Sequence, residues 1–419
     1  MRKMKDSGIE WIGEIPKSWT ITILSALFSE RKCKNSGLTE NNLLSLSYGN
    51  IVRKNIESNE GLLPASFETY NIIEPGNIVF RLTDLQNDKR SLRTGLCQER
   101  GIITSAYVTL QIRSNDSPRY MHYLFHTYDL CKVFYGMGDG VRQGMNYEDL
   151  KRLRILRPDQ ETQRRIADYL DRKCSQIDTI IARQQEVIEK LRAYKLSVIT
   201  EAVTKGLNPD VPMKDSGVEW IGEVPEHWDI LKLQAHTRML TPMRDRPEKL
   251  DGDIPWVRIE DYDGKYISAS KEGLGVSTET VKEMNLKIYP VGSILCTSSC
   301  DLGKCAIVTR ELVSNQRFIN IIPDSNTNSD YLYYLMLSNA ERLNHLSTGT
   351  IQANLSRKAF EHLMVQFPPI SEQKAIAEYL DRKCEAVELS INKKQELIDR
   401  LSSYKKSLIY EVVTGKKEV

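Results

Sequence analysis

The stretch MKDSGIEWIGEIPKSW, residues 4–19, decides the fold because the chain repeats it almost unchanged as MKDSGVEWIGEVPEHW at residues 213–228. A second matching pair, IADYLDRKC at 166–174 and IAEYLDRKC at 376–384, follows at an offset only one residue larger. This period is far longer than the roughly 20 to 50 residues of solenoid and propeller repeats. The sequence therefore predicts two domain-sized copies whose beginnings and ends are alike.

The middles of the two copies have diverged. GNIVFRLTDLQNDKRSLRTG at 76–95 stands roughly where GSILCTSSCDLGKCAIVTRE stands at 292–311. NIVFRL, YVTLQI, GSILCT and FINIIP are rich in the β-branched and aromatic residues of strands, whereas YMHYLFHTYDL and YLYYLMLSNAERLNHL have the periodicity of amphipathic helices. We expect two globular domains of mixed α/β class, at residues 1–158 and 213–368.

Each copy ends in a long helix, predicted at residues 159–205 and 369–415 and separated from the next copy by a short linker at 206–212. Both helices carry apolar residues at alternating spacings of four and three, which is the seam of a coiled coil. The first seam includes Leu170, Ile177, Ile181, Gln184, Ile188, Leu191 and Val198; the second includes Leu380, Val387, Ile391, Lys394, Ile398, Leu401 and Leu408.

A narrow seam along about 40 residues, roughly 60 Å of helix, suits a partner helix better than the surface of one domain. Packing of each helix on its own domain is the alternative. Because the linker is short, the second domain must begin at the far end of the first helix and its own helix must run back. We expect an antiparallel pair with a pseudo-twofold axis, where Gln184 and Lys394 face each other.

Composition leaves function open. The chain has 419 residues, a net charge of +2 and 8 cysteines without a paired framework, which fits a soluble protein of a reducing compartment. No signal peptide and no membrane-spanning run is visible, so a cytoplasmic location and no membrane partner are expected. The small net charge means that a nucleic-acid partner must be argued from local clusters.

Two heads joined by paired helices suit a target with two parts, such as DNA read in half-sites about one helical turn apart, roughly 34–36 Å. The repeated opening, the variable middles and the helix starts PDQETQRRIADYLDRK and PPISEQKAIAEYLDRK together closely resemble the specificity subunit of type I restriction–modification systems. The resemblance covers nearly the whole chain. It implies two target recognition domains reading a split, asymmetric site in double-stranded DNA.

The resemblance also implies partners. Two methyltransferase subunits carrying S-adenosylmethionine would dock on this chain, and translocase–nuclease (restriction) subunits using ATP and Mg would complete the complex. No cofactor and no catalytic residues are expected on this chain itself. A free-standing DNA-binding regulator and a scaffold that binds proteins only are the alternatives; an enzyme in its own right is the least favoured class.

The residues contain few chemical motifs of their own. We find no Asn-Pro-Pro-aromatic tetrad, no Walker phosphate loop and no His-Glu-x-x-His helix. The glycine-rich GMGDG at 136–140 lacks the context of a nucleotide site and reads as a loop. Cys296, Cys300 and Cys305 lack C-x₂-C spacing, so buried thiols are favoured over a metal site and no metal is expected.

DNA contacts are therefore expected in the variable middles, where Arg and Lys neutralise phosphates and where Arg, Gln and Asn fit base edges. Gln143 and Gln352 occupy matching places in DGVRQGMNY and TGTIQANLS. A solvated surface charge is the alternative for any single basic residue. The candidates are Arg81, Lys89, Arg90, Arg93, Arg142 and Gln143 in the first copy, and Arg258, Lys265, Ser298, Ser299, Gln316, Arg317, Gln352 and Asn354 in the second.

Four tryptophans of the repeated opening, Trp11, Trp19, Trp220 and Trp228, need a separate interpretation. Indoles stack on bases, but residues that read two different half-sites should differ between the copies. Packing of the opening segment onto its domain or onto the helix pair is therefore favoured. The repeat predicts that the same joint is built twice.

Overall fold

The computed structural model describes residues 2–55, 64, 66–83, 85, 92–137, 144–242, 245–299, 302–346 and 355–419. The chain forms two compact units, Met1–Gln184 with Glu396–Val419 and Gln185–Gln395. Each unit therefore contains one copy's variable domain, the first part of that copy's helix and the last part of the other copy's helix. Within the described ranges, no helix is both long enough and apolar enough to cross a membrane.

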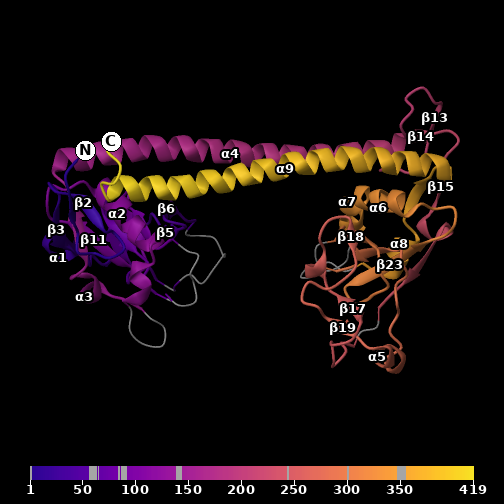
Figure 1. Cartoon of the computed structure of the whole chain (residues 1–419), viewed down its shortest axis with the longest axis horizontal. Coiled ribbons are helices and arrows are strands. Elements are labelled where there is room, and N and C mark those ends of the chain that lie inside the picture. The colour runs from indigo at the N-terminus through magenta and orange to yellow at the C-terminus, as the bar shows by residue number, and fades with distance from the viewer. Residues whose placement is uncertain are drawn as a thin grey trace. The chain divides into compact units, whose positions relative to one another are not determined.

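Two helices account for the ends of both copies: α4 (Gln160–Lys205) and α9 (Ile370–Val413). In the first unit Lys405 Nζ lies 2.6 Å from Asp178, and in the second unit Lys195 Nζ lies 2.6 Å from Glu388. In each unit the start of one helix therefore packs against the end of the other. The pairing is antiparallel (Figure 1). The two ion pairs give the same register in both units.

The predicted seam coincides with the buried stripe of both helices. Residues one or two positions away, such as Ile180 and Leu389, are exposed, which is the pattern of a coiled-coil seam. Seam residues that are buried are Leu170, Ile177, Ile188, Leu380, Ile391, Ile398 and Leu408, while Ile181, Gln184, Leu191, Val198, Val387, Lys394 and Leu401 are half-buried.

Within each unit the ion pairs define the register only near Gln184 and near Lys394. Continued along the first unit from the Lys405–Asp178 pair, the register sets Gln184 opposite position 399. Continued along the second unit from the Lys195–Glu388 pair, it sets Lys394 opposite position 189. The meeting of Gln184 with Lys394 joins the two units and stays a prediction.

The first unit is built on a four-stranded antiparallel sheet of order β4-β11-β8-β9, with two-stranded pieces β10-β7, β5-β6, β12-β3 and β1-β2. Its elements are β1 (Met4–Asp6), β2 (Glu14–Pro16), β3 (Thr20–Ile23), α1 (Leu24–Leu27), β4 (Phe28–Glu30), β5 (Leu44–Ser47), β6 (Asn50–Arg53), β7 (Asn71–Ile73), β8 (Ile78–Phe80), β9 (Thr94–Leu96), β10 (Gly101–Ile103), β11 (Val108–Ile112), α2 (Pro118–Leu130), η1 (Val133–Gly136), α3 (Tyr147–Leu150) and β12 (Arg154–Arg157).

Helix α2 covers this sheet. Ser117 caps it by accepting from the amide of Tyr120, and Pro118 occupies the first turn, where its missing N–H costs nothing. Its buried face includes Met121, Leu124 and Phe125, and the last of these rings packs on Phe28 and Phe80. The same core contains residues of both long helices, including Leu170 and Val412.

The second unit repeats this plan with additions. Its main sheet has the order β16-β23-β20-β21-β18, and a second sheet has the order β19-β17-β22. Its elements are β13 (Met213–Asp215), β14 (Glu223–Pro225), β15 (Asp229–Lys232), η2 (Leu233–Ala235), β16 (Thr237–Leu240), β17 (Ile254–Val257), η3 (Ile259–Asp261), β18 (Tyr266–Ile267), β19 (Gly275–Val276), α5 (Thr278–Glu283), β20 (Ile294–Thr297), β21 (Cys305–Val308), β22 (Val313–Ser314), β23 (Phe318–Pro323), α6 (Ser329–Ser338), α7 (Ala340–Leu346), α8 (Arg357–Glu361) and β24 (Met364–Phe367).

The repeated opening forms the joint between each domain and the end of the other copy's helix. It folds as the hairpins β1-β2 and β13-β14, which lead to the buried indoles of Trp19 and Trp228. In the first unit the Tyr120 hydroxyl donates to the carbonyl of Val413 at 3.3 Å. In the second unit Gln366 Nε2 donates to the carbonyl of Val203 at 2.7 Å. The tryptophan positions therefore support packing, as the repeat predicts.

The other two tryptophans of the opening are less deeply placed. Trp11 is half-buried and packs edge-to-face on Tyr128, with ring centroids 4.8 Å apart. Trp220 is 43% exposed, and the guanidinium of Arg342 lies 4.0 Å from its ring centroid. This indole is held by a cation–π contact on the surface of the second unit instead of in its core.

One glutamine at the start of each long helix fixes the helix to its domain. Gln163 accepts from the amide of Ser117 at 2.8 Å and donates to the carbonyl of Pro158 at 2.9 Å. Gln373 makes the matching bonds to Asn328 and Pro368, each at 2.8 Å. Both side chains are buried, so each helix begins at a defined point against α2 or α6.

Candidate nucleic-acid interface

The central strand pair of each main sheet ends at an equivalent place. In the first unit Phe80 of β8 pairs with Val108 of β11, and in the second unit Thr297 of β20 pairs with Phe318 of β23. Arg81 and Ser298 are the next residues after these strands. We call these two places the strand-end sites; some of the sequence candidates lie there, namely Arg81 in the first copy and Ser298 and Arg317 in the second.

Few first-copy candidates can be placed. Arg81 is half-buried, directly after β8, and its amide donates to the carbonyl of Arg93 at 2.9 Å. The amide of Met145 donates to the carbonyl of Leu82 at 2.9 Å, so the chain also returns to this site after residue 144. Lys89, Arg90, Arg142 and Gln143 lie outside the described residues.

Arg93 does not fit its predicted role as a DNA contact. Its side chain is completely buried, and its guanidinium donates to the carbonyls of Arg81 at 3.2 Å and Thr83 at 2.8 Å. Its Nε donates to the hydroxyl of Tyr135 at 3.2 Å. A guanidinium enclosed in this way cannot reach a base edge in this conformation, so Arg93 instead fixes the loop after β8.

In the second unit the strand-end site brings several candidates together. The amide of Ser298 donates to the carbonyl of Arg317 at 2.8 Å, and the carbonyl of Ser298 accepts from Leu355 at 2.8 Å. Gln316 and Arg317 are exposed, Ser299 is half-buried and Ser298 is buried. Gln352 and Asn354 lie outside the described residues, directly before Leu355. An exposed amide and an exposed guanidinium at one site suit contacts to bases and phosphates.

Lys265 and Arg258 are ion-paired within the second unit. Lys265 Nζ lies 2.6 Å from Asp330 of α6 and 2.5 Å from Asp381 of α9. Burial would lower the pKa of this ammonium, but the two carboxylates outweigh it and the pKa is raised. Arg258 lies 2.8 Å from Glu272. Lys265, directly before the edge strand β18, therefore links this edge of the sheet to α6 and α9 by ion pairs. Its predicted DNA contact stays a prediction.

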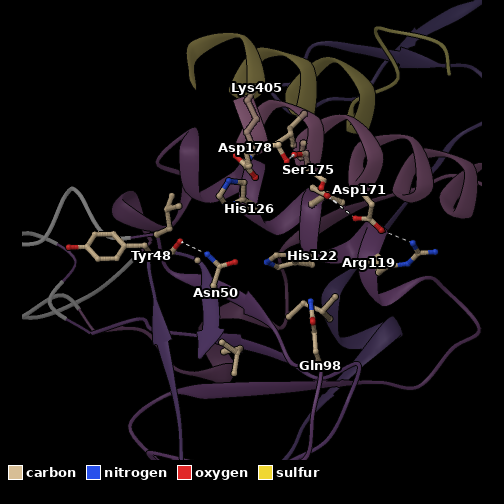
Figure 2. Close-up of a pocket in the computed structure, with 18 of the residues that line it drawn as sticks. Tyr48, Asn50, Gln98, Arg119, His122, His126, Asp171, Ser175, Asp178 and Lys405 are labelled. Carbon is tan, nitrogen blue, oxygen red and sulfur yellow. Dashed lines mark hydrogen bonds and ion pairs between the residues drawn. The ribbon is translucent and has the colours of Figure 1, made fainter. Parts of the chain in front are cut away.

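The matching part of α4 in the first unit lines a pocket (Figure 2). The pocket has a volume of about 850 Å³ and lies among the β5-β6 hairpin, α2 and both long helices. Asp171, which matches Asp381, accepts instead from Arg119 at 2.6 Å and from the Tyr123 hydroxyl at 2.8 Å. Four residues of the hairpin, Tyr48, Gly49, Asn50 and Ile51, line this pocket.

Two histidines of α2 line this pocket. His122 and His126 are one helical turn apart, with ring centroids 6.3 Å apart. Burial lowers the pKa of His122 to about 4, and burial with repulsion from His122 and Lys405 lowers the pKa of His126 to about 3. Nε2 of His122 is buried without a hydrogen-bond partner. Both rings are neutral near pH 7, and the described residues contain no group of three or more His, Cys, Asp or Glu arranged to hold a metal ion.

The cysteines placed in the core behave as packing residues. Cys296 and Cys305 are opposite each other on β20 and β21, and both are buried free thiols. Burial raises the pKa of Cys296 well above its ordinary value. Cys300 lies outside the described residues. The two described thiols thus agree with the interpretation as buried side chains.

Sequence reasoning missed the pocket and the tip of the β5-β6 hairpin. The four-residue spacing of the histidines in YMHYLFHTYDL would have placed both on one face of a helix. The dipeptide Tyr48-Gly49 between two strand-like stretches would have indicated a tight hairpin turn. Neither signal reveals that Asp171 borders a pocket while the matching Asp381 binds Lys265.

Part of the chain matches the model of a known protein family. Residues 228–398 match the family described as Type I restriction modification DNA specificity domain. The MjaIX specificity subunit of a type I restriction enzyme from Methanocaldococcus jannaschii is 32% identical over 188 residues, which is 43% of each chain. The putative MjaX specificity subunit of the same organism is 22% identical, over 97% of this chain and 96% of that one.

Solved structures share the fold. A chain from work on complex assembly and conformational transition of the type I R-M system superposes with a TM-score of 0.72 at 13% identity, covering 96% of this chain and 99% of that one. The HsdS subunit from Thermoanaerobacter tengcongensis gives a TM-score of 0.50 at 13% identity, covering 96% and 98%. At this identity the likeness establishes the arrangement of elements and leaves the individual contacts to this chain's own residues.

Proposed function

We propose that this chain, which belongs to the family of type I restriction–modification specificity subunits, reads a bipartite, asymmetric site in double-stranded DNA. Each unit reads one half of the site with its strand-end site. The chain itself performs no catalysis, and the methyltransferase and nuclease activities are carried by partner subunits.

The observation that carries this proposal is that one frame is built twice with different side chains at its exposed edge. The same hairpin, capping glutamine and central strand pair recur in both units. At the end of the central strand, however, the first unit has the half-buried Arg81, and the second has the buried Ser298 beside the exposed Arg317. Because base edges are distinguished by such donors and acceptors, two different edges on one frame suit two different half-sites.

The paired helices are the proposed docking surface for two methyltransferase subunits. Both helices expose tyrosines at matching places, Tyr194 at 52% and Tyr404 at 51%. Exposed aromatic residues of this kind are enriched at protein interfaces. Two equivalent surfaces would bind two equal partners, which would carry S-adenosylmethionine; restriction subunits using ATP and Mg would join the same complex.

The proposal is tested by mapping methylated adenines at base resolution in cells that express this chain with its candidate methyltransferase partner. Cells that express the partner alone are the control. We expect a new motif with two specified halves and an unspecified gap, present only when this chain is expressed. The map gives both half-sites and the gap length together.

Two other outcomes would favour the alternative functions. A confirmed stable complex that produces no motif would favour a scaffold that binds proteins only. Tight, sequence-specific DNA binding by the isolated chain, with no complex and no methylation, would favour a free-standing regulator. Either result would overturn the assignment to a methylation complex.

A further inference from the structure

Tyr48 occupies the tip of the β5-β6 hairpin in a conformation that disfavours a tyrosine. Ser47 pairs with Asn50, so the loop consists of Tyr48 and Gly49 alone. Their φ angles are 45° and 82°, the left-handed values of a type I′ turn. Asn or Gly is strongly preferred at the first of these positions because Cβ is strained at positive φ.

Burial does not compensate for this strain. The side chain of Tyr48 is 76% exposed, the largest exposure among the large hydrophobic residues of the described chain. Figure 2 shows its ring directed away from the labelled residues of the pocket. Strained residues that the fold itself does not use occur preferentially at binding sites. The geometry therefore points to a ligand outside the chain.

The hairpin tip is connected to the strand-end site of the same unit. A Cβ placed on Gly49 would lie 3.2 Å from Cβ of Leu92, so the turn rests directly on that side chain. The next residue is Arg93, which binds the carbonyls of Arg81 and Thr83. The tip and the proposed DNA-reading edge thus share one continuous packing arrangement.

In the second unit, a turn with a glycine at positive φ is followed by an ion-paired lysine. There Gly264 has a φ of 77°, and the following Lys265 binds Asp330 and Asp381. That turn is occupied with holding the long helix. In the first unit Asn50, which follows Gly49, is exposed, and its amide donates to the carbonyl of Tyr48 at 3.4 Å. Among the described residues, Asn50 makes no ion pair like those of Lys265.

We propose that Tyr48 contacts the DNA of the first half-site, with its ring packed against a nucleotide. This inference rests on the proposed function and assigns a residue that determines affinity for one half only. Because the base faces of duplex DNA are stacked on one another, the ring is offered to a sugar or to a thymine methyl group. Removing an aromatic contact of this kind should cost about tenfold in affinity.

The test compares Tyr48→Asn and Tyr48→Phe with the unaltered chain, each in the complete complex with its methyltransferase partner. The measurements are affinity for duplex DNA carrying the mapped site and the thermal unfolding midpoint. We expect Tyr48→Asn to weaken binding by about tenfold while raising the midpoint by roughly 1–3 °C, because asparagine suits the turn. Tyr48→Phe keeps the ring and should bind within about threefold.

Leu38 supplies the matched control. It has a φ of 54° and is 57% exposed, in the turn that Asn35 closes. Leu38→Asn should raise the midpoint in the same direction and leave DNA affinity unchanged. This variant separates relief of backbone strain from loss of a DNA contact.

If Tyr48→Asn raises the unfolding midpoint and weakens DNA binding, Tyr48 is a residue that serves binding at the expense of stability. If Tyr48→Asn binds the site as the unaltered chain does, the inference is overturned. If Tyr48→Phe loses as much as Tyr48→Asn, contact through the ring is overturned, because the hydroxyl carries the effect. If the unaltered complex itself shows no preference for the mapped site, the proposed function fails, and this result is distinct from both.

Discussion

Gly415 lies against Trp19 in the first unit: a Cβ on that glycine would stand 3.0 Å from Cη2 of the indole and 2.5 Å from Cδ of Pro16. Its φ is 73°, which glycine adopts without strain. The second unit repeats the relationship between Gly206, with a φ of 75°, and Trp228, at 3.1 Å. Each repeated opening thus packs against the glycine that follows the end of the other copy's helix.

Gly415→Ala should therefore destabilise the first unit by about 2–4 kcal/mol, from backbone strain together with the collision at Pro16. Calorimetric unfolding of the whole chain checks the shift. Gly37→Ala is the control because Gly37 has the same φ of 73° and nothing within 4 Å of its Cβ position. It should cost only about 1 kcal/mol. Equal losses in the two variants would show that close packing at Trp19 contributes nothing.

Leu380 tests the seam within the second unit. Its side chain is fully buried in the core formed by α9, the end of α4 and the main sheet. Leu380→Ala should cost about 2–5 kcal/mol, since it removes buried methyl groups and leaves a cavity. Leu389→Ala, on the same helix at a position that is 55% exposed, should change stability by less than about 0.5 kcal/mol. Similar effects from both would contradict a seam that buries one face of the helix.

The pocket histidines should make the first unit sensitive to mild acid. Burial lowers the pKa of His122 to about 4 from an ordinary value of 6.5. The unfolded chain then binds more protons than the folded one between these values, so stability is complete above pH 6.5 and is lost as the pH falls toward 4. Between pH 6.5 and 5 the loss should be about 2 kcal/mol.

His122→Gln should flatten this part of the stability–pH profile, measured as unfolding midpoints from pH 5 to 7. The charged groups around the ring, Asp171, Asp178, Arg119 and Lys405, remain in place. Ser175→Ala alters the same pocket without removing a titrating group and should keep the slope. An unchanged slope in His122→Gln would show that the imidazole is as easily protonated in the fold as in the unfolded chain.

The helix pair could be predicted because its information is local. The spacing of Leu170, Ile177 and Ile181 specifies a face regardless of what covers it. The end of each helix packs in the other copy's unit, Val203 in the second and Val413 in the first. This exchange could not be predicted, because it depends on the surfaces of the domains that receive the helix ends. The register between the two helices could not be predicted either, since a heptad pattern defines a face but not the register.

The site could be predicted only at the level of segments. Arg93 and Arg81 belong to the same variable stretch and have the same chemistry, yet one is completely buried and the other borders the strand-end site. That difference depends on Tyr135 and Thr83, whose positions follow from tertiary packing. The ion pairs of Lys265 could not be predicted either, because its partner Asp381 is far away in sequence.

The proposed function makes the paired helices a spacer whose length sets the gap between half-sites. Seven residues inserted at the unit boundary of each helix, after Gln184 and after Gln395, add about 10 Å while keeping the heptad phase. The gap should then grow by roughly three base pairs at 3.4 Å each, or methylation should cease because the reading domains are rotated around the duplex. A four-residue insertion is the control, since it breaks the seam phase and should lower the unfolding midpoint. Methylation mapping gives the gap directly, and a complex that still methylates its original site with the original gap would refute the spacer role.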